Sequence, residues 1–148
     1  MPEKKTTEAA AKDKKEGKSP STQAGEYVHE EIDHIREGKH GAKSTKQAIA
    51  IGLSKARRAG VKLGAPKKAS AATRKKAAQD SATGKKASKS VSRTRSKATS
   101  KALKKEGHAA ASPKALSKQA KTAAAKRTAS ERSASARKAA RTRAKKSS

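Results

Sequence analysis

Large aliphatic side chains are concentrated in one short part of the chain, and their spacing there is that of a helix. Val28, Ile32 and Ile35 follow one another at positions i, i+4 and i+7, which places them on one helical face. The hydroxyl pair at 21–22 is suited to cap the start of this helix, and Gly38 is suited to end it. The pattern predicts a first amphipathic helix between these two signals.

The second helical segment has clearer start and stop signals. Ser44 at the N-cap and Gln47 three residues later fit the capping-box pattern, in which each side chain satisfies a backbone amide of the other residue. Gly60 is a typical end signal, and three cations that favour a helix C-terminus precede it. One face of this segment carries Ile49, Leu53 and Ala56. We therefore expect a second amphipathic helix that packs against the first.

The two apolar faces predict an αα-hairpin with residues 38–43 as its turn. Val61 and Leu63 can fold back over its open end. Because the core would hold only about eight aliphatic side chains, its stability is expected to be marginal. The sequence leaves two ways of completing this core, folding onto a partner and forming a homodimer through Ile51 within residues 21–63.

The segments on either side have no comparable pattern. Residues 1–20 are polar and of mixed charge and end at a Ser-Pro break, so we expect a flexible arm with at most a short helix at 7–15. Residues 64–148 are of low complexity, because 71 of these 85 residues are Ala, Lys, Arg, Ser or Thr. The predicted organisation is a flexible arm (1–20), a helical hairpin (21–63) and a low-complexity basic tail (64–148).

The tail lacks the apolar area that would hold a core together. Its large aliphatic residues are Val91, Leu103 and Leu116. Burying them does not offset an ordering entropy of about 1–2 kcal/mol per residue. Ala, Lys and Arg favour helix, whereas repulsion between cations at i,i+4 opposes it. The predicted fold class is therefore mostly α with extensive disorder. It consists of a short helical hairpin and an Ala/Lys-rich tail that is helical in part, chiefly beyond Pro113 and when phosphates neutralise it.

The net charge is +28, and it is distributed unevenly. Nine of the twelve acidic residues lie in residues 1–37, whereas residues 64–148 carry 26 basic residues and three acidic ones. An excess of this size is beyond what solubility requires and indicates a polyanionic partner. The sequence has no cysteine for disulfides or thiolate metal sites and no apolar run long enough to cross a membrane. We therefore expect a cytoplasmic protein.

Duplex DNA fits these features better than the other polyanions do. A membrane surface requires bulky apolar anchors, and single-stranded nucleic acids are bound by aromatic stacking, for which Tyr27 is the only aromatic side chain. Binding along a duplex backbone requires only cations and the release of counterions. We expect phosphate contacts rather than base reading, because Asn is absent and Gln occurs only four times. RNA is the second candidate partner.

The predicted phosphate-binding residues are the cations of the hairpin and of the basic clusters in the tail. In the hairpin they are Lys39, Lys43, Lys46, Lys55, Arg57 and Arg58. In the tail they are Lys67, Lys68, Arg74, Lys75, Lys76, Lys85, Lys86, Arg93, Arg95, Lys104, Lys105, Lys126, Arg127, Arg137, Lys138, Arg141, Arg143, Lys145 and Lys146. Such clusters contact phosphates without reading sequence.

Three motifs resemble sites for base reading, nucleotide hydrolysis and metal binding, but each lacks a feature that the function requires. A helix-turn-helix protein would read bases from the start of the second helix, where residues 45–47 offer little for the purpose. Residues 38–45 resemble a phosphate-binding loop but lack the Walker spacing, so they suggest a backbone-phosphate anchor rather than nucleotide hydrolysis. Residues 29–34 resemble a metalloprotease helix, which needs two histidines at i and i+4 to bind a metal from one face. His29 and His34 are five residues apart and therefore lie on different faces of the helix. The sequence predicts no enzyme, catalytic residue, cofactor or metal site.

Two parts of the chain resemble known proteins. Residues 21–63, with the Lys-Gln-Ala-Ile-Ala-Ile run at 46–51, resemble a small uncharacterised bacterial family, which implies a bacterial origin and no mechanism. The basic tail is similar to linker-histone C-terminal tails and to bacterial histone-like proteins, which implies a nucleoid-associated protein that neutralises and bridges DNA. Two alternatives are an RNA- or ribosome-associated basic protein and a disordered stress protectant. The scarcity of acids after residue 37 argues against the protectant.

Overall fold

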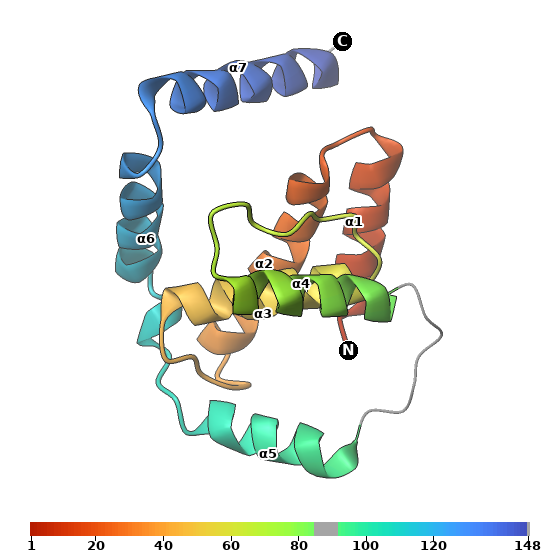
Figure 1. Ribbon diagram of the computed structural model, residues 1–148, viewed down its shortest axis with the longest axis vertical. Helices are drawn as coiled ribbons and strands as arrows, with labels where there is room; N and C mark the ends of the chain where they lie inside the picture. The colour runs from red at the N-terminus through yellow and green to blue at the C-terminus, as the bar shows by residue number, and fades with distance from the viewer. Residues whose placement is uncertain (85–91, 148) are drawn as a thin grey trace. The chain divides into compact units, whose positions relative to one another are not determined.

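Helices form most of the chain that the structure describes. The structure is a computed structural model that describes residues 1–84 and 92–147, and these residues form seven α-helices and one short 3-10 helix, without a strand among them (Figure 1). The helices are α1 (Lys4–Lys15), α2 (Pro20–Arg36), α3 (Thr45–Arg58), α4 (Ala71–Gly84), α5 (Arg93–Lys104), η1 (Ala109–Ala111), α6 (Pro113–Ala125) and α7 (Ala129–Lys146). The chain forms two compact units, Met1–Ser112 and Pro113–Ser148.

The prediction of extensive disorder is wrong. The tail forms α4, α5, α6 and α7, and the arm forms α1. Ala, Lys and Arg have high helix propensity, and local end signals add to it. Ser92 caps α5, Pro113 begins α6, and Thr128 forms a capping box on α7. Helix propensity and end caps stabilise a helix without a buried apolar face. The number of aliphatic residues therefore does not predict which parts of the tail are helical. Residues 85–91 of the tail lie outside the described residues.

α1 packs against α2 instead of forming a flexible arm. The amide of Glu3, just before α1, donates a hydrogen bond to Oε2 of Glu30 on α2 at 3.0 Å. Ala10 on α1 is buried, and three residues of α2 and α3 complete its cluster. They are Ala24, Tyr27 and Ala56. The N-terminal segment thus supplies part of the core that the hairpin alone could not form.

α2 begins earlier than the sequence signals indicate. Ser19 is its N-cap, with Oγ accepting from the amide of Thr22, and Pro20 is its first residue. Proline is favoured at this position because its missing amide is one that would have no helical partner and its fixed φ suits a helix. The Ser-Pro pair that was expected to break the chain therefore starts a helix, and the hydroxyl pair at 21–22 lies inside its first turn.

The other predicted helix ends are confirmed. Gly38 and Gly60 follow α2 and α3 with φ angles of 74° and 91°, a left-handed conformation that glycine adopts without a steric cost. Ser44 is the N-cap of α3, because its Oγ accepts from the amide of Gln47 at 3.2 Å. The Gln47 side chain accepts in return from the amide of Lys43 at 2.7 Å, one residue before the position that a capping box would use.

α2 and α3 form the predicted hairpin, but the face through which α3 packs is shifted from the predicted one. The buried positions of this face are Ala48, Gly52 and Ala56. Ile49 and Leu53, which the sequence pattern favours, are only partly buried. Small residues allow the two backbones to come close, since a Cβ added at Gly52 would lie 2.7 Å from Cα of Val28 on α2. Of the three predicted positions, Ala56 is buried and Leu53 packs against the core cluster, so the buried face is shifted towards the small residues rather than replaced.

The open end of the hairpin is closed from within the same chain. Val61 and Leu63 fold back and pack against the buried cluster, as predicted. α4 packs along another side of α3. Ile51, the residue considered for a dimer contact, is partly buried. In Figure 1, α4 lies beside α3. The first helix of the basic tail is thus part of the folded unit.

A buried acid attaches α4 to α3. Asp80 on α4 is 4% exposed and accepts a hydrogen bond from the Ser54 hydroxyl on α3 at 2.7 Å. It also pairs with Arg58 of α3 at 3.3 Å and with Lys76 of its own helix at 3.0 Å. Burial acts to raise the pKa of Asp80, but the hydrogen bonds from Ser54 and Lys76 and the two cations outweigh it and lower this pKa below 3.8.

Backbone contacts attach the end of α5 to the hairpin turn. The amide of Gly41 donates to the carbonyl of Leu103 at 2.9 Å, and the amide of Ala42 donates to that of Gly107 at 3.1 Å. A Cβ at Gly41 would lie 1.9 Å from the carbonyl oxygen of Glu106, so this approach requires glycine. The hydroxyl of Thr45 adds a buried hydrogen bond to the carbonyl of Ala110 in η1 at 2.7 Å.

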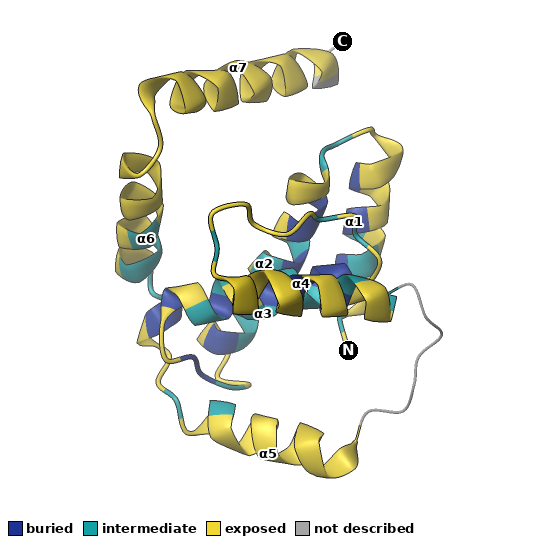
Figure 2. Ribbon diagram, in the orientation of Figure 1, coloured by how far each residue is buried: buried dark blue, intermediate teal, exposed yellow. Residues whose placement is uncertain are grey.

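The second unit consists of α6 and α7. Pro113 is the first residue of α6, as predicted, and Thr128 and Glu131 form the capping box that starts α7. The side chains described on α7 are all exposed, as its uniform colour in Figure 2 shows. Among the described residues, no helix is both long enough and apolar enough to cross a membrane.

Candidate nucleic-acid interface

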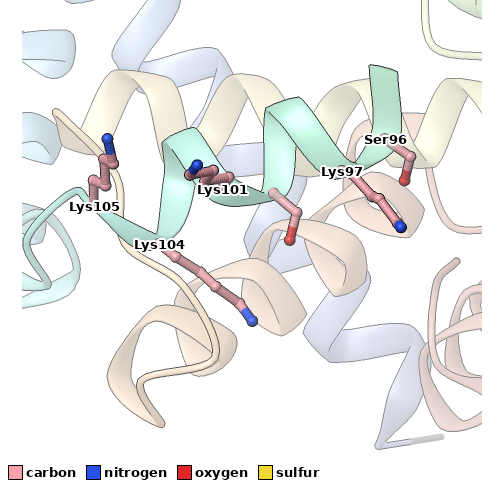
Figure 3. Close-up of a pocket in the computed structure, with 6 residues that line it drawn as sticks. Ser96, Lys97, Lys101, Lys104 and Lys105 are labelled. Carbon is pink, nitrogen blue, oxygen red and sulfur yellow. The ribbon is translucent and has the colours of Figure 1, made fainter. Parts of the chain in front are cut away.

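α5 presents four lysines on one of its faces. They are Lys97, Lys101, Lys104 and Lys105, called here the α5 lysine row. Their spacing of i, i+4, i+7 and i+8 places them within about 100° of the helix circumference. With Ser96 and Ser100 they line a hollow of about 560 Å³ (Figure 3). Because every lining residue belongs to α5 or directly follows it, this hollow is a surface groove along one helix.

The α5 lysine row is exposed and has no acidic residue beside it on the helix. α5 itself contains no Asp or Glu and buries none of its residues. In Figure 3 the labelled lysine side chains extend away from the helix axis. Ammonium groups at this spacing, alternating with serine hydroxyls, can contact several oxygens of a phosphate backbone. The contacts of Gly41 and Ala42 hold the C-terminal end of this row against the hairpin.

α6 has a similar arrangement within the second unit. Its lysines at 114, 118 and 121 recur at i, i+4 and i+7 on one face. They line a groove of about 360 Å³ together with Ser117 and Thr122. Thus α5 and α6 both combine lysines with neighbouring hydroxyl groups at helical spacing.

α7 carries cations on more than one side of the helix. Those whose side chains the structure describes are Arg132, Arg137, Lys138, Arg141, Arg143 and Lys145. The unit Pro113–Ser148 contains twelve basic residues and one acidic residue, Glu131. That carboxylate accepts a hydrogen bond from the amide of Thr128 in the capping box. Nearly all the positive charge of this unit is therefore available to an external anion.

Most of the predicted phosphate-binding residues are exposed, and their side chains form no ion pair within the described part of the chain. They are Lys43, Lys46, Lys67, Lys68, Arg74, Lys75, Arg93, Arg95, Lys104, Lys105, Lys126, Arg127, Arg137, Lys138, Arg141, Arg143 and Lys145. Of these, Arg127 is held by hydrogen bonds to the carbonyl of Glu131 and to Ser135. Lys85 and Lys86 lie outside the described residues, as does the side chain of Lys146.

Two of the predicted residues hold the fold together instead. Lys55 pairs with Glu31 at 2.7 Å and with Glu30 at 3.2 Å, and both of these carboxylates are buried. Arg57 is 8% exposed and donates hydrogen bonds to the carbonyls of Leu63 and Gly64. Neither side chain is free to bind phosphate, because each satisfies buried acceptors.

Three further predicted residues are exposed cations that are paired with carboxylates of the fold. Hydrogen bonds with Glu37 and then Glu3 raise the pKa of Lys39, and the two carboxylates neutralise its charge. Arg58 and Lys76 share the carboxylate of Asp80. A phosphate would have to compete with these partners, so we assign these three residues no leading role in binding.

Sequence reasoning identified Lys104 and Lys105 of the α5 groove but missed the other lysines of the two grooves. Lys97 and Lys101 on α5, and the three lysines of α6, were not among the predicted contacts. The prediction favoured basic residues that are adjacent in sequence, whereas neighbours on a helix surface are three or four positions apart. The helical spacing of single lysines is the sequence signal that would have identified both grooves.

The structure does not favour base reading or phosphate binding at the start of α3. Thr45 is buried and Gln47 accepts from the amide of Lys43, so both side chains serve the local fold. The amides of Gly41 and Ala42 donate to carbonyls at the end of α5. The loop that resembled a phosphate anchor therefore uses these amides to hold the chain together.

A family match covers the first three helices. Residues 3–69 match the family of unknown function DUF6496. This DUF6496 segment contains α1, α2, α3 and the connection that follows, so it extends beyond the resemblance seen at 21–63. The α5 lysine row and the second unit lie outside the DUF6496 segment. No curated protein and no solved structure matches the chain.

Proposed function

We propose that this protein binds duplex DNA through the phosphate backbone, without reading its sequence, and is not an enzyme. It would act as a histone-like, nucleoid-associated protein of a bacterial cytoplasm. The observation that supports this most strongly is the unbalanced charge of exposed helices. The unit formed by α6 and α7 has twelve basic residues and one acid, and that acid is used in a capping box. Cations without internal partners gain most from replacing the counterions of a polyanion.

The kind of nucleic acid follows from what the exposed helices lack. Tyr27, the only aromatic side chain, is 2% exposed, so it cannot stack on an unpaired base. The described part of α7 has no large apolar side chain to anchor it in a membrane. A duplex backbone requires neither feature. Helices with lysines on one face can follow a line of phosphates, and contacts of this kind carry no sequence information.

The two units supply two separate cationic surfaces. The α5 lysine row belongs to the unit Met1–Ser112, and α6 and α7 form the unit Pro113–Ser148. Nine of the twelve acids lie in residues 1–37, where they pair largely with cations of the same fold. A chain with two cationic surfaces can contact two duplex segments, which is the requirement for bridging DNA.

Competition binding tests this function. The full chain is mixed at low ionic strength with a labelled duplex, and unlabelled competitors are added at equal phosphate concentration. Duplexes of unrelated sequence should compete equally well, because phosphate contacts do not distinguish them. Structured RNA should compete less well, and if it competes better, the RNA-associated role replaces the proposed one. Failure to bind any duplex at low ionic strength would remove the basis of the proposal.

A further inference from the structure

A buried carboxylate of α2 lies beside two histidines near the hairpin turn. Glu31 is 0% exposed, and its Oε2 pairs with the ammonium group of Lys55 at 2.7 Å, whereas its Oε1 accepts no hydrogen bond. One ligand atom from each of Glu31, His34 and His40 lies within 4.8 Å of the others. A buried carboxylate oxygen without a hydrogen bond is energetically costly, so a donor or a cation is expected beside Oε1.

The contacts of His40 indicate which of its ring nitrogens carries a hydrogen and which carries a lone pair. Nδ1 of His40 lies 3.0 Å from the carbonyl oxygen of Gly41, which can only accept, so this nitrogen carries the hydrogen. In the neutral ring, Nε2 then has a lone pair, and it lies 3.2 Å from Oε1 of Glu31. Two lone pairs facing each other at this distance require a cation between them, either a proton or a metal ion.

Both histidines have the outer partners that metal-binding histidines use. A backbone carbonyl orients His40, and Nε2 of His34 lies 2.9 Å from Oε1 of Glu3. Carbonyl and carboxylate partners of this kind fix the tautomer and orientation of a histidine that binds metal through its other nitrogen. Both side chains are largely enclosed, with 14% of His34 and 17% of His40 exposed.

The charges around this cluster suit a cation despite the positive charge of the whole chain. The nearby carboxylates are those of Glu3, Glu30, Glu31 and Glu37. The ammonium groups that pair with them are those of Lys39 and Lys55. With neutral histidines, the cluster has a local excess of two negative charges. Lys55 contacts Oε2 of Glu31 at 2.7 Å, which leaves Oε1 directed towards His40.

We propose that Glu31, His34 and His40 bind a divalent transition-metal ion of the zinc type. Two imidazole nitrogens and one carboxylate oxygen form a common ligand set for zinc, and water can occupy the fourth tetrahedral position. In such a site, ligand atoms at about 2.1 Å from the metal are about 3.4 Å apart. The 3.2 Å separation between Nε2 of His40 and Oε1 of Glu31 is close to this value.

The site joins α2 to the turn that holds α5. Glu31 and His34 belong to α2, His40 belongs to the turn, and Gly41 donates to the end of α5 through Leu103. A metal bound here would stabilise the fold and the attachment of the α5 lysine row, and it is independent of any nucleic acid. The sequence did not reveal the site, because His34 pairs with His40 from the loop and not with His29 on its own helix.

Zinc titration of the full, metal-free chain tests the site. Calorimetry should show one ion per chain, and thermal unfolding should shift upwards with zinc because the folded state binds it. The variants His34→Gln and His40→Gln each remove one ligand and should weaken zinc binding by at least about tenfold. Cobalt(II) should give a tetrahedral visible spectrum with the parent chain, and this spectrum should be lost in both variants.

The matched control is His29→Gln, because this histidine is 76% exposed and pairs with Asp33 outside the cluster. The control should bind zinc like the parent chain. Because Glu31→Gln removes a buried ion pair and can unfold the protein, the two histidine variants decide the test, with circular dichroism to verify their fold. Absence of zinc binding by the parent chain, or equal binding by His40→Gln and His29→Gln, would overturn the proposal.

Discussion

The hydroxyl of Ser54 on α3 donates a hydrogen bond to the carboxylate of Asp80 on α4 at 2.7 Å, although the two residues are 26 positions apart. This contact shows that the low-complexity tail begins with a helix that belongs to the folded unit. Only three acids follow residue 37, and this one is buried among cations of two helices. Its placement explains why a chain so poor in acids keeps one at this position.

Asp80→Asn should lower the free energy of unfolding by about 1–3 kcal/mol at neutral pH, because it removes the charge from a buried, hydrogen-bonded site. The pKa of Asp80 is lowered in the folded state, so its contribution is complete above the ordinary value of 3.8 and is lost as pH falls through the folded value. The difference between parent and variant should therefore shrink below about pH 4. Urea unfolding at several pH values measures it.

The control for this variant is Asp33→Asn. Asp33 pairs with His29 at the surface, with 40% of its side chain exposed, and should change stability by less than about 0.5 kcal/mol. Equal stability of Asp80→Asn and the parent at pH 7 would mean that α4 is not attached through this acid.

Gly52→Ala and Gly25→Ala should change stability in opposite directions. A Cβ at Gly52 would lie 2.7 Å from Cα of Val28, so this variant should be destabilised by about 1–3 kcal/mol through overpacking between α2 and α3. Gly25 lies in α2 with nothing within 4 Å of an added Cβ, so its variant should gain about 0.5–1 kcal/mol from helix propensity. Thermal unfolding followed by circular dichroism compares them, and stabilisation by both substitutions would contradict the close packing.

The sequence predicts the local features of this fold well. The N-cap at Ser44, the stops at Gly38 and Gly60 and the start of α6 at Pro113 are encoded by the residues themselves, and the structure confirms them. The hairpin also follows from the periodic spacing of apolar residues. Such features depend on positions within one or two helical turns, so they are readable without knowledge of the remaining chain.

Features that depend on distant residues could not be predicted. The burial of Ala48 and Gly52 instead of Ile49 depends on the closeness of α2, and the burial of Arg57 depends on the return of residues 63–64. The order of the tail was missed because its helices rely on propensity and caps more than on a core. Lys97 and Lys101 of the α5 lysine row were missed because lysines that are not adjacent in sequence become neighbours only on the surface of a helix.

Neutralising three lysines of the α5 lysine row should weaken DNA binding more than neutralising three exposed lysines elsewhere in the chain. The variant replaces Lys97, Lys101 and Lys104 with Gln. If all three contact phosphates, the slope of log K against log salt should become less steep by about 2.7. The matched control replaces Lys5, Lys14 and Lys15 of α1, which are exposed and form no ion pair within the described residues. Fluorescence anisotropy with a labelled duplex measures both, and equal losses would show that the row is not a preferred contact.

The dependence of DNA affinity on salt tests the central claim most directly, namely that the exposed cations of α5, α6 and α7 replace the counterions of a duplex. The full chain is titrated with one labelled duplex at a series of salt concentrations. If about ten phosphates are engaged, log K should fall with log salt at a slope near −9. A slope near zero, or no binding at the lowest salt concentration, would contradict the account.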